Sequence, residues 1–336
     1  MTSENNSLLL NLQEVDKTTG EVVKLDVNST STVQPVALMR LGLFVPTLKS
    51  TGKSKANRKN VTDATEELVQ LSIAKSEGYI DVKITGSRLD MDTDFKVWLG
   101  IIRSMSEYGV KSDTLELSFV EFVKMCGFDS RRSNKKMRDR ISNSLFKLAS
   151  VTLKFQSETK GWTTHLVQSA YYDINEDIVE IKAEPKLFEL YHMDRRVLLR
   201  LKAIDALQRK ESAQALYTYI ESLPQNPAPI SMKRMRERLN LTSNVYTQNH
   251  TVRKAMEQLR DIGYLDYTEF KRGRATYFSV HYRNPKLISA PVKVPRNEEE
   301  EKAPEQNYDE VIKALKAAGI DPLKLAEALS AMKPEN

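Results

Sequence analysis

Three alternating aspartates are the strongest candidates in this chain for chemistry on a bound ion. On a strand, Asp90, Asp92 and Asp94 would share one face, and carboxylate oxygens are the ligands that Mg²⁺ prefers. A calcium loop of the EF-hand type would have glycine at its sixth position, where Phe95 stands. A helical pattern starts at about Asp92, however, so we expect the three carboxylates to cap that helix and to favour its dipole.

The other reactive residue types form no catalytic or metal-binding pattern. Residues 52–54 (Gly-Lys-Ser) resemble the end of a phosphate-binding loop, but the glycine required five positions earlier is replaced by Thr47. No two of the four histidines lie at metal-ligand spacing. The single cysteine, Cys126, lies in an apolar segment, so we expect a small buried side chain and no disulfide framework. We therefore expect no enzymatic activity, no cofactor and no metal.

Amide and cationic side chains in residues 229–282 point to nucleic acid instead. Gln248 and Asn249 can pair with adenine N6 and N7, and Arg253 can give guanine O6 and N7 a bidentate contact, so we predict base readout by these three. The candidates for contact to the DNA backbone are Lys233, Arg234, Lys254, Arg260, Lys271, Arg272 and Arg274. An ordinary solvated face is the competing interpretation. The seven Lys or Arg against two acids in 233–260 favour DNA.

The elements that must position these residues follow the order of a winged helix. Ser231 can cap a short helix, residues 242–246 break the helical pattern, and a longer helix with one apolar stripe starts at about Thr247. After Gly263 the hydrophobic period changes to two, in two strands joined by the basic turn 271–274. A scaffold helix, a recognition helix and a cationic hairpin together predict a module that holds duplex DNA.

The same order of elements occurs earlier in the chain. The pattern predicts helices and strands over 92–108, 114–118, 118–126, 133–149, 151–158, 164–173 and 177–184. The fold class predicted from this repetition is α+β, with two tandem winged-helix domains and flexible N- and C-terminal tails. The helix over 133–149 and the turn before it are also basic, with cations that include Arg131, Arg132, Lys135, Lys136, Arg138 and Arg140. Auxiliary DNA contact, a domain interface and a solvated surface are the three interpretations of this set, and we assign no base readout to it.

Domain boundaries follow from these elements and from composition. We expect a mostly flexible N-terminal arm (1–62), a first winged-helix domain (63–187), a second (188–288), and an acidic linker with amphipathic helices (289–336). Further elements are expected over 64–76 (helix), 79–85 (strand), 196–207 (helix) and 210–223 (helix). The stretch 49–62 has five Lys or Arg and no acid, which suits either a solvated loop or an arm on the DNA backbone. The C-terminal helices could dock a partner or pack as an appendage.

Composition narrows the class of protein. The chain has 336 residues, a length that suits two domains. Its composition, 29% charged and 40% hydrophobic, is typical of a globular protein, and its formal net charge is +6. No apolar run approaches the roughly 20 residues of a membrane span. The N-terminal residues lack the features of a signal peptide. We therefore expect a cytoplasmic protein with no membrane partner.

Four segments resemble a known family. They are TVQPVALMRLGLFVP (32–46), GYIDVKITGSRLDMDTDFKVW (78–98), ALYTYIESLPQNPAPIS (215–231) and KAMEQLRDIGYL (254–265). They are similar to the RepA initiators of RepFIB-type plasmid replicons, which belong to the iteron-binding initiators with tandem winged helices. The resemblance spans 32–287 and implies binding to repeated origin DNA, opening of the adjacent duplex and recruitment of host helicase, initiator and chaperone proteins. The glutamate-rich sequence after Glu298 departs from the family pattern.

The resemblance also implies self-association and copy-number control. Monomers would act at the origin repeats and dimers at the operator of the protein's own gene, with the first winged helix carrying much of the dimer interface. Two alternatives remain. One is a dimeric transcriptional repressor without an origin-opening role. The other is a metal-dependent primase or polymerase-like enzyme that uses Asp90, Asp92 and Asp94.

Overall fold

The computed structural model describes residues 13–15, 22–24, 27–47, 61–63, 79–108, 114–129, 134–173, 175–185, 187, 191 and 196–287. The chain divides into two compact units, residues 1–291 and 292–336, and all described residues belong to the first unit. Several expectations lie outside the described residues: the helix over 64–76, most of the basic stretch 49–62, Arg131, Arg132, and the segment 289–336.

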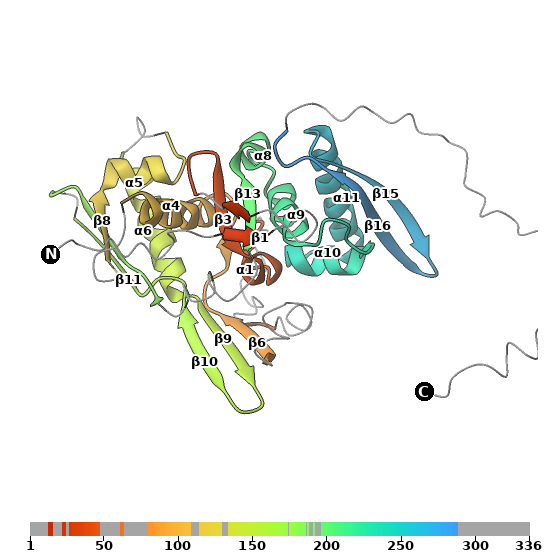
Figure 1. Cartoon of the computed structure of the whole chain (residues 1–336), viewed down its shortest axis with the longest axis horizontal. Helices are drawn as coiled ribbons and strands as arrows, with labels where there is room; N and C mark the ends of the chain where they lie inside the picture. The colour runs from red at the N-terminus through yellow and green to blue at the C-terminus, as the bar shows by residue number, and fades with distance from the viewer. Residues whose placement is uncertain are drawn as a thin grey trace, which may run out of the picture. The chain divides into compact units, whose positions relative to one another are not determined.

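The first winged helix comprises three helices and a hairpin in the expected order. Its elements are α4 (Asp94–Tyr108), β8 (Thr114–Ser118), α5 (Phe119–Met125), α6 (Lys135–Ser150), β9 (Thr152–Ser157) and β10 (Gly161–His165) (Figure 1). A capping box starts α5, because the Ser118 hydroxyl accepts from the Glu121 amide and the Glu121 carboxylate accepts from the Ser118 amide. Gly100 lets α4 approach α5, since a Cβ there would lie 2.4 Å from the Cys126 sulfur. Cys126 is buried, as predicted, and burial raises the pKa of its thiol.

Two sheets extend this domain. The hairpin β9–β10 continues into β6 (Tyr79–Thr85) and β5 (Val61–Asp63). In the other sheet, β11 (Ser169–Asp173) pairs with β12 (Ile178–Lys182), which in turn pairs with β8. The single strand predicted over 164–173 is therefore wrong, because the chain leaves one sheet after His165 and enters the other at Ser169. Leu166 and Val167 between them are buried. Because both residues are apolar, the sequence pattern did not indicate that the chain changes sheet at this point.

Residues 31–45, which we expected in a flexible arm, are part of the core. They form β3 (Ser31–Pro35), α1 (Val36–Arg40) and β4 (Phe44–Val45), preceded by the hairpin β1 (Gln13–Val15) and β2 (Val22–Lys24). β3 pairs with β13 (Arg196–Arg200), and β4 pairs with β7 (Leu89–Asp90). Because residues 196–200 form a strand, the helix expected over 196–207 is shorter than predicted and comprises only α8 (Leu201–Ala206). Buried Gln34 accepts hydrogen bonds from Trp98 Nε1 at 3.0 Å and from the Tyr191 hydroxyl at 3.2 Å. These bonds tie the N-terminal segment to the first domain.

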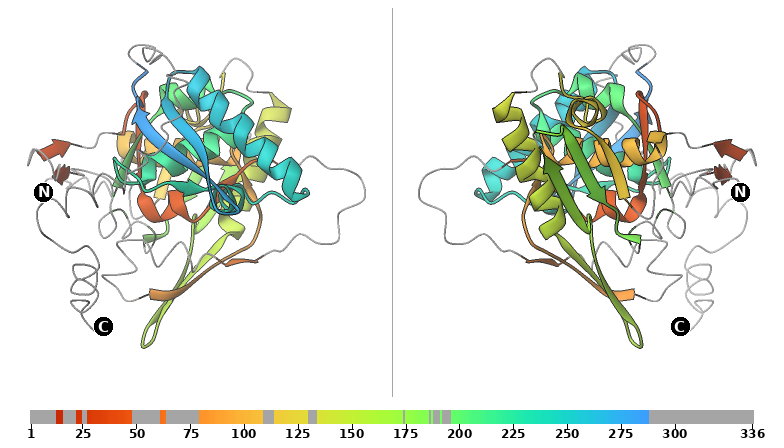
Figure 2. Two further views of the ribbon diagram at one scale, coloured as in Figure 1. Left: turned by 90° about the vertical axis from the view of Figure 1, so that its right-hand side faces the viewer. Right: turned by 90° about the vertical axis from the view of Figure 1, so that its left-hand side faces the viewer.

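The second winged helix has the order expected of its class. Its elements are α9 (Glu211–Ser222), β14 (Ile230–Ser231), α10 (Met232–Leu239), α11 (Val245–Asp261), β15 (Leu265–Arg272) and β16 (Ala275–Arg283). Ser231 caps α10, as predicted, by accepting from the Arg234 amide. The hairpin β15–β16 runs beside α11 (Figures 1 and 2), and its turn contains Gly273 at φ +61°, where a side chain would be strained. α9 packs against both α10 and α11 and so supports the helix that carries the predicted base-reading residues.

Candidate nucleic-acid interface

α11 buries one face and exposes the other. Its buried stripe includes Val252, Met256 and Leu259, as predicted. Between its start and Glu257, the exposed residues are Val245, Tyr246, Thr247, His250, Arg253, Lys254 and Glu257. The side chain of Tyr246 is 84% exposed at the start of the helix. We define these seven residues as the exposed face of α11.

Two residues of this face, Val245 and Tyr246, were missed by the sequence interpretation. We expected them in the break between helices. Instead, α11 begins at Val245, because the Asn244 side chain accepts a hydrogen bond from the Thr247 amide. Asparagine is a favoured N-cap residue, so Asn244 was the available signal for the earlier start. An apolar residue and a tyrosine in the first turn can contact thymine methyl groups in a major groove.

Gln248 and Asn249 lie on the flank of α11, and neither is fully exposed. The Gln248 side-chain amide donates to the carbonyl oxygens of Leu241 at 3.1 Å and Ser243 at 2.6 Å, so it holds the turn before the helix. Asn249 Oδ1 is buried and has no hydrogen-bond partner among the described residues. Both side chains would have to reorient to pair with adenine, and their base readout stays a prediction.

Two arginines of α11 are joined to the hairpin. Arg253 donates from Nε and Nη2 to the Glu269 carboxylate, with a shortest distance of 2.7 Å. These hydrogen bonds raise the pKa of Arg253 above its ordinary value. Arg260 donates to Asp266 Oδ1 at 3.1 Å and to the Tyr267 carbonyl oxygen, and stacks 3.9 Å above the Tyr267 ring. The DNA-backbone role that we predicted for Arg260 stays a prediction, and its guanidinium already links α11 to β15.

The remaining predicted backbone contacts differ in how accessible they are. Lys271, Arg272 and Arg274 are exposed at the hairpin tip and form no ion pair with a described residue. Lys254 is exposed on α11. On α10, Lys233 is exposed and lies 3.7 Å from Glu237, whereas Arg234 is half-buried above the Tyr219 ring. Cations thus occupy both α11 and the hairpin tip, which is the arrangement that phosphate contacts require.

The first domain has a smaller basic surface. Lys135 and Lys136 are exposed in the first turn of α6. Arg138 lies 3.4 Å from Asp177 and 4.5 Å above the Phe119 ring, so it is engaged in contacts within the domain. The auxiliary DNA or interface role of Lys135 and Lys136 stays a prediction.

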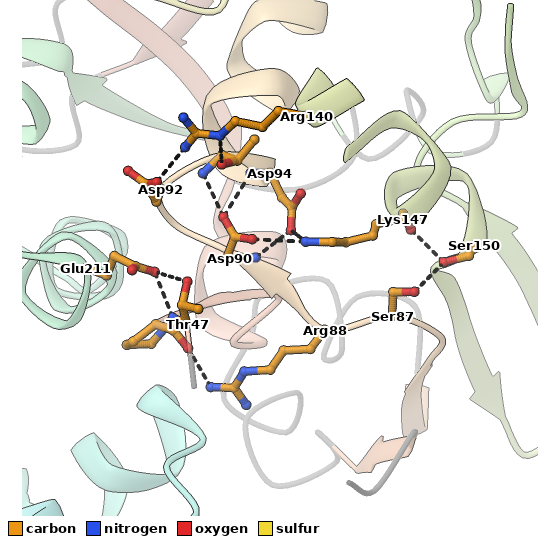
Figure 3. A network of polar contacts seen from close by, with 12 residues as sticks. Thr47, Ser87, Arg88, Asp90, Asp92, Asp94, Arg140, Lys147, Ser150 and Glu211 are labelled. Atoms are coloured by element: carbon orange, nitrogen blue, oxygen red, sulfur yellow. Dashed lines mark hydrogen bonds and ion pairs between the residues drawn. The ribbon is translucent and has the colours of Figure 1, made fainter. Parts of the chain in front are cut away.

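The three aspartates surround the start of α4, as predicted. Asp90 Oδ1 accepts hydrogen bonds from the backbone amides of Thr93 and Asp94 at 2.7 and 3.2 Å, which confirms the capping interpretation (Figure 3). Lys147 donates to Asp90 at 3.0 Å and to Asp94 at 2.5 Å, and burial together with the neighbouring Asp90 carboxylate raises the pKa of Asp94 to about 6. Among the described residues, no three His, Cys, Asp or Glu side chains are placed to hold a metal ion.

Cations outside the acidic cluster complete the network in Figure 3. Arg140 donates to Asp92 at 2.5 Å. Arg88 donates to the carbonyl oxygens of Pro46 and Asn240, each at 2.9 Å, and so reaches the end of α10. Each of the three aspartate carboxylates therefore has a cationic partner within the protein. Within the described residues, no helix is both long enough and apolar enough to cross a membrane.

Both domains and the chain as a whole are similar to known proteins. Residues 91–221 match the family described as "Initiator Replication protein, WH1", and residues 231–281 match "Initiator Rep protein, WH2". The chain is 58% identical over 291 residues to RepFIB replication protein A of Salmonella typhi and, equally, of Escherichia coli, with 85% of this chain and 88% of each relative covered. It is 54% identical over 314 residues to a replication protein RepA of Salmonella typhi, covering 92% and 90%.

One solved structure shows a more remote likeness. It contains domains 2 and 3 of RctB and aligns with a TM-score of 0.44 at 11% identity, covering 76% of this chain and 99% of that chain. This likeness is too weak to add to the family assignment.

Proposed function

Because this chain belongs to the initiator replication protein family of RepA-type plasmid replication initiators, we propose that it binds repeated DNA sites at a plasmid origin. There it promotes opening of the adjacent duplex and recruits host helicase, initiator and chaperone proteins. It also controls copy number by repressing its own gene. These steps take place in the bacterial cytoplasm, where plasmid origins are replicated.

The observation that carries this proposal is the second winged helix. Its exposed α11 face and the cationic tip at Lys271, Arg272 and Arg274 belong to adjacent elements. In such a module the early residues of the recognition helix reach base edges, while the hairpin contacts phosphates. We assign base readout to α11, with Tyr246 added to the residues expected from sequence, and phosphate contact to the hairpin tip.

Lys271→Ala tests the phosphate role of the hairpin. Lys271 is exposed and makes no ion pair with a described residue, so its removal should cost one phosphate contact and leave the fold intact. We expect affinity to fall by a similar factor for the cognate repeat and for random duplex, and the slope of log K against log salt to become shallower by about 1. Binding titrations at several salt concentrations measure both quantities. A selective loss of cognate binding would contradict the phosphate assignment.

Replication itself tests the function. A circular DNA that carries only this gene, its flanking DNA and a selectable marker should replicate in a host such as Escherichia coli, where relatives occur. The matched control carries Arg253→Ala in the same gene and should fail to replicate. If the wild-type version also fails in hosts that replicate relatives' origins, the initiator proposal is lost.

The DNA beside the gene distinguishes an initiator from a dimeric repressor. Footprinting on that DNA should protect direct repeats of about two helical turns beside an AT-rich stretch. An isolated inverted repeat as the only protected site would support the repressor instead. The footprint also supplies the cognate sequence for every binding measurement.

We assign self-association to the first winged helix. In the described sheet, β11 is an edge strand, and its Tyr171 and Tyr172 are 56% and 42% exposed. An exposed edge strand offers unpaired amide and carbonyl groups to a second chain. Sedimentation of the free chain and of the chain on repeat DNA measures this equilibrium, and dimers are expected mainly off the repeats.

We also propose that the chain has no enzymatic activity of its own. Support comes from the three aspartates, whose carboxylates are engaged by Lys147, Arg140 and backbone amides. Nucleotide incorporation that depends on Asp92 would contradict this proposal, and an assay of wild type against Asp92→Ala decides it.

A further inference from the structure

Glu269 faces the recognition helix from the hairpin. It lies on β15 opposite Phe278 of β16, and residues directly opposite in an antiparallel pair share one face of the sheet. Phe278 is fully buried, so Glu269 is on the face that packs toward the interior. From there its carboxylate accepts from Arg253 Nε at 2.9 and 3.0 Å and from Nη2 at 2.7 Å. The contact joins residues 16 positions apart on two different elements.

These hydrogen bonds leave a defined part of the guanidinium available. An arginine side chain has five N–H donors in a rigid plane. Glu269 takes the edge formed by Nε and one hydrogen of Nη2, and Nη1 makes no hydrogen bond to a described residue. The outer edge, formed by Nη1 and the second hydrogen of Nη2, therefore keeps two parallel donors. Two parallel donors are what guanine O6 and N7 accept in the major groove.

The ion pair is too exposed to serve mainly as a stabilising contact. The Arg253 and Glu269 side chains are 46% and 31% exposed, and exposed ion pairs add little to folding stability. A carboxylate near a DNA interface also repels phosphates, which lowers affinity for every sequence. A residue that reduces general affinity but holds a base-reading arginine in one orientation raises selectivity.

We propose that Glu269 is a positioning residue for DNA recognition, which holds Arg253 so that its outer edge reads a guanine. The inference rests on the proposed function, because it requires α11 to enter the major groove. It adds to that function a specificity determinant outside the recognition helix, on a residue whose own charge opposes DNA binding. The base that Arg253 reads while Glu269 holds it is a single guanine in each repeat.

The chain provides a matched control in the same strand. Asp266 accepts from Arg260 Nε at 3.1 Å, so it also joins an α11 arginine to β15. Arg260 is in the last turn of α11, far from the first turns that meet base edges. Asp266→Asn and Glu269→Gln remove the same charge from β15, but only Glu269→Gln releases Arg253.

The test uses the full chain and three kinds of labelled duplex: the repeat found by footprinting, a set of repeats with each guanine replaced in turn, and a random duplex of equal length. Glu269→Gln should lower the cognate-to-random affinity ratio about 5- to 20-fold, with the discrimination lost at one guanine, while random-duplex affinity stays equal or rises. Asp266→Asn should shift both affinities alike and leave the ratio unchanged. In an Arg253→Ala background, Glu269→Gln should have no further effect on the ratio.

Two results would overturn the inference. The first is that Glu269→Gln raises the affinity for the cognate repeat and the affinity for random duplex by the same factor. The Glu269 carboxylate would then only repel phosphates and would not position Arg253. The second is a fall in the ratio that persists in the Arg253→Ala background. Failure of the proposed function looks different, because the wild-type chain would then show no preference for the flanking repeat over random duplex.

Discussion

Arg253→Ala should weaken binding to the cognate repeat about 10- to 100-fold while changing random-duplex affinity much less. A bidentate contact between arginine and guanine contributes about 1–3 kcal/mol of discrimination, and that contribution disappears with the side chain. Arg253 is half-exposed on α11, held by Glu269, and its outer donors are available to a base. Fluorescence anisotropy with the footprinted repeat and a random duplex measures both affinities.

Arg253→Lys is the matched control for this experiment. Lysine keeps the positive charge but has no planar fork for bidentate pairing. We therefore expect Arg253→Lys to retain random-duplex affinity and to lose most of the selectivity. If Arg253→Lys binds the cognate repeat as the wild type does, Arg253 acts as a phosphate contact and the assignment of base readout to it is wrong. Equal effects of Arg253→Ala and Lys271→Ala on both duplexes would also defeat the division between helix and hairpin.

Arg238→Met should destabilise the fold by about 3 kcal/mol. The Arg238 side chain on α10 is 5% exposed and donates to the carbonyl oxygens of Met39 at 3.1 Å and Phe44 at 3.1 Å, and to the Thr218 hydroxyl at 3.3 Å. Removing these donors leaves buried acceptors unsatisfied, at about 1–3 kcal/mol for each group. Methionine fills much of the same volume without donors. Urea denaturation followed by circular dichroism measures the change.

Lys233→Met on the same helix is the control for this substitution. Its side chain is 70% exposed, and surface substitutions usually change stability by less than about 0.5 kcal/mol. An Arg238→Met protein as stable as Lys233→Met would show that the buried carbonyl groups of residues 39 and 44 find other partners. The comparison also separates folding from DNA binding, because Lys233 is a predicted phosphate contact and Arg238 is not accessible to DNA.

Much of the fold was predictable because its signals are local. The apolar stripe of α11, the cap at Ser231 and the glycine-containing turn at the hairpin tip each depend on a few neighbouring residues. Those signals predicted both winged helices in the right order. The errors arose where pairing is long-range. β3 and β13 are joined across about 160 positions, and neither the arm expected at 31–34 nor the helix expected at 196–200 contains a local sign of that pairing.

The candidate site shows the same difference between local signals, which the sequence contains, and long-range contacts, which form only on folding. Sequence by itself determined that a recognition helix and a basic hairpin are present, because periodicity and turn residues act over short distances. Only the tertiary structure decided which groups of the protein these cations contact. Of the seven Lys or Arg in 233–260, Arg238 is buried against residues 39–44, and Arg253 and Arg260 are held by carboxylates of β15. A count of charges cannot distinguish these roles, because whether an arginine faces DNA, a carboxylate or a buried carbonyl depends on partners brought together by folding.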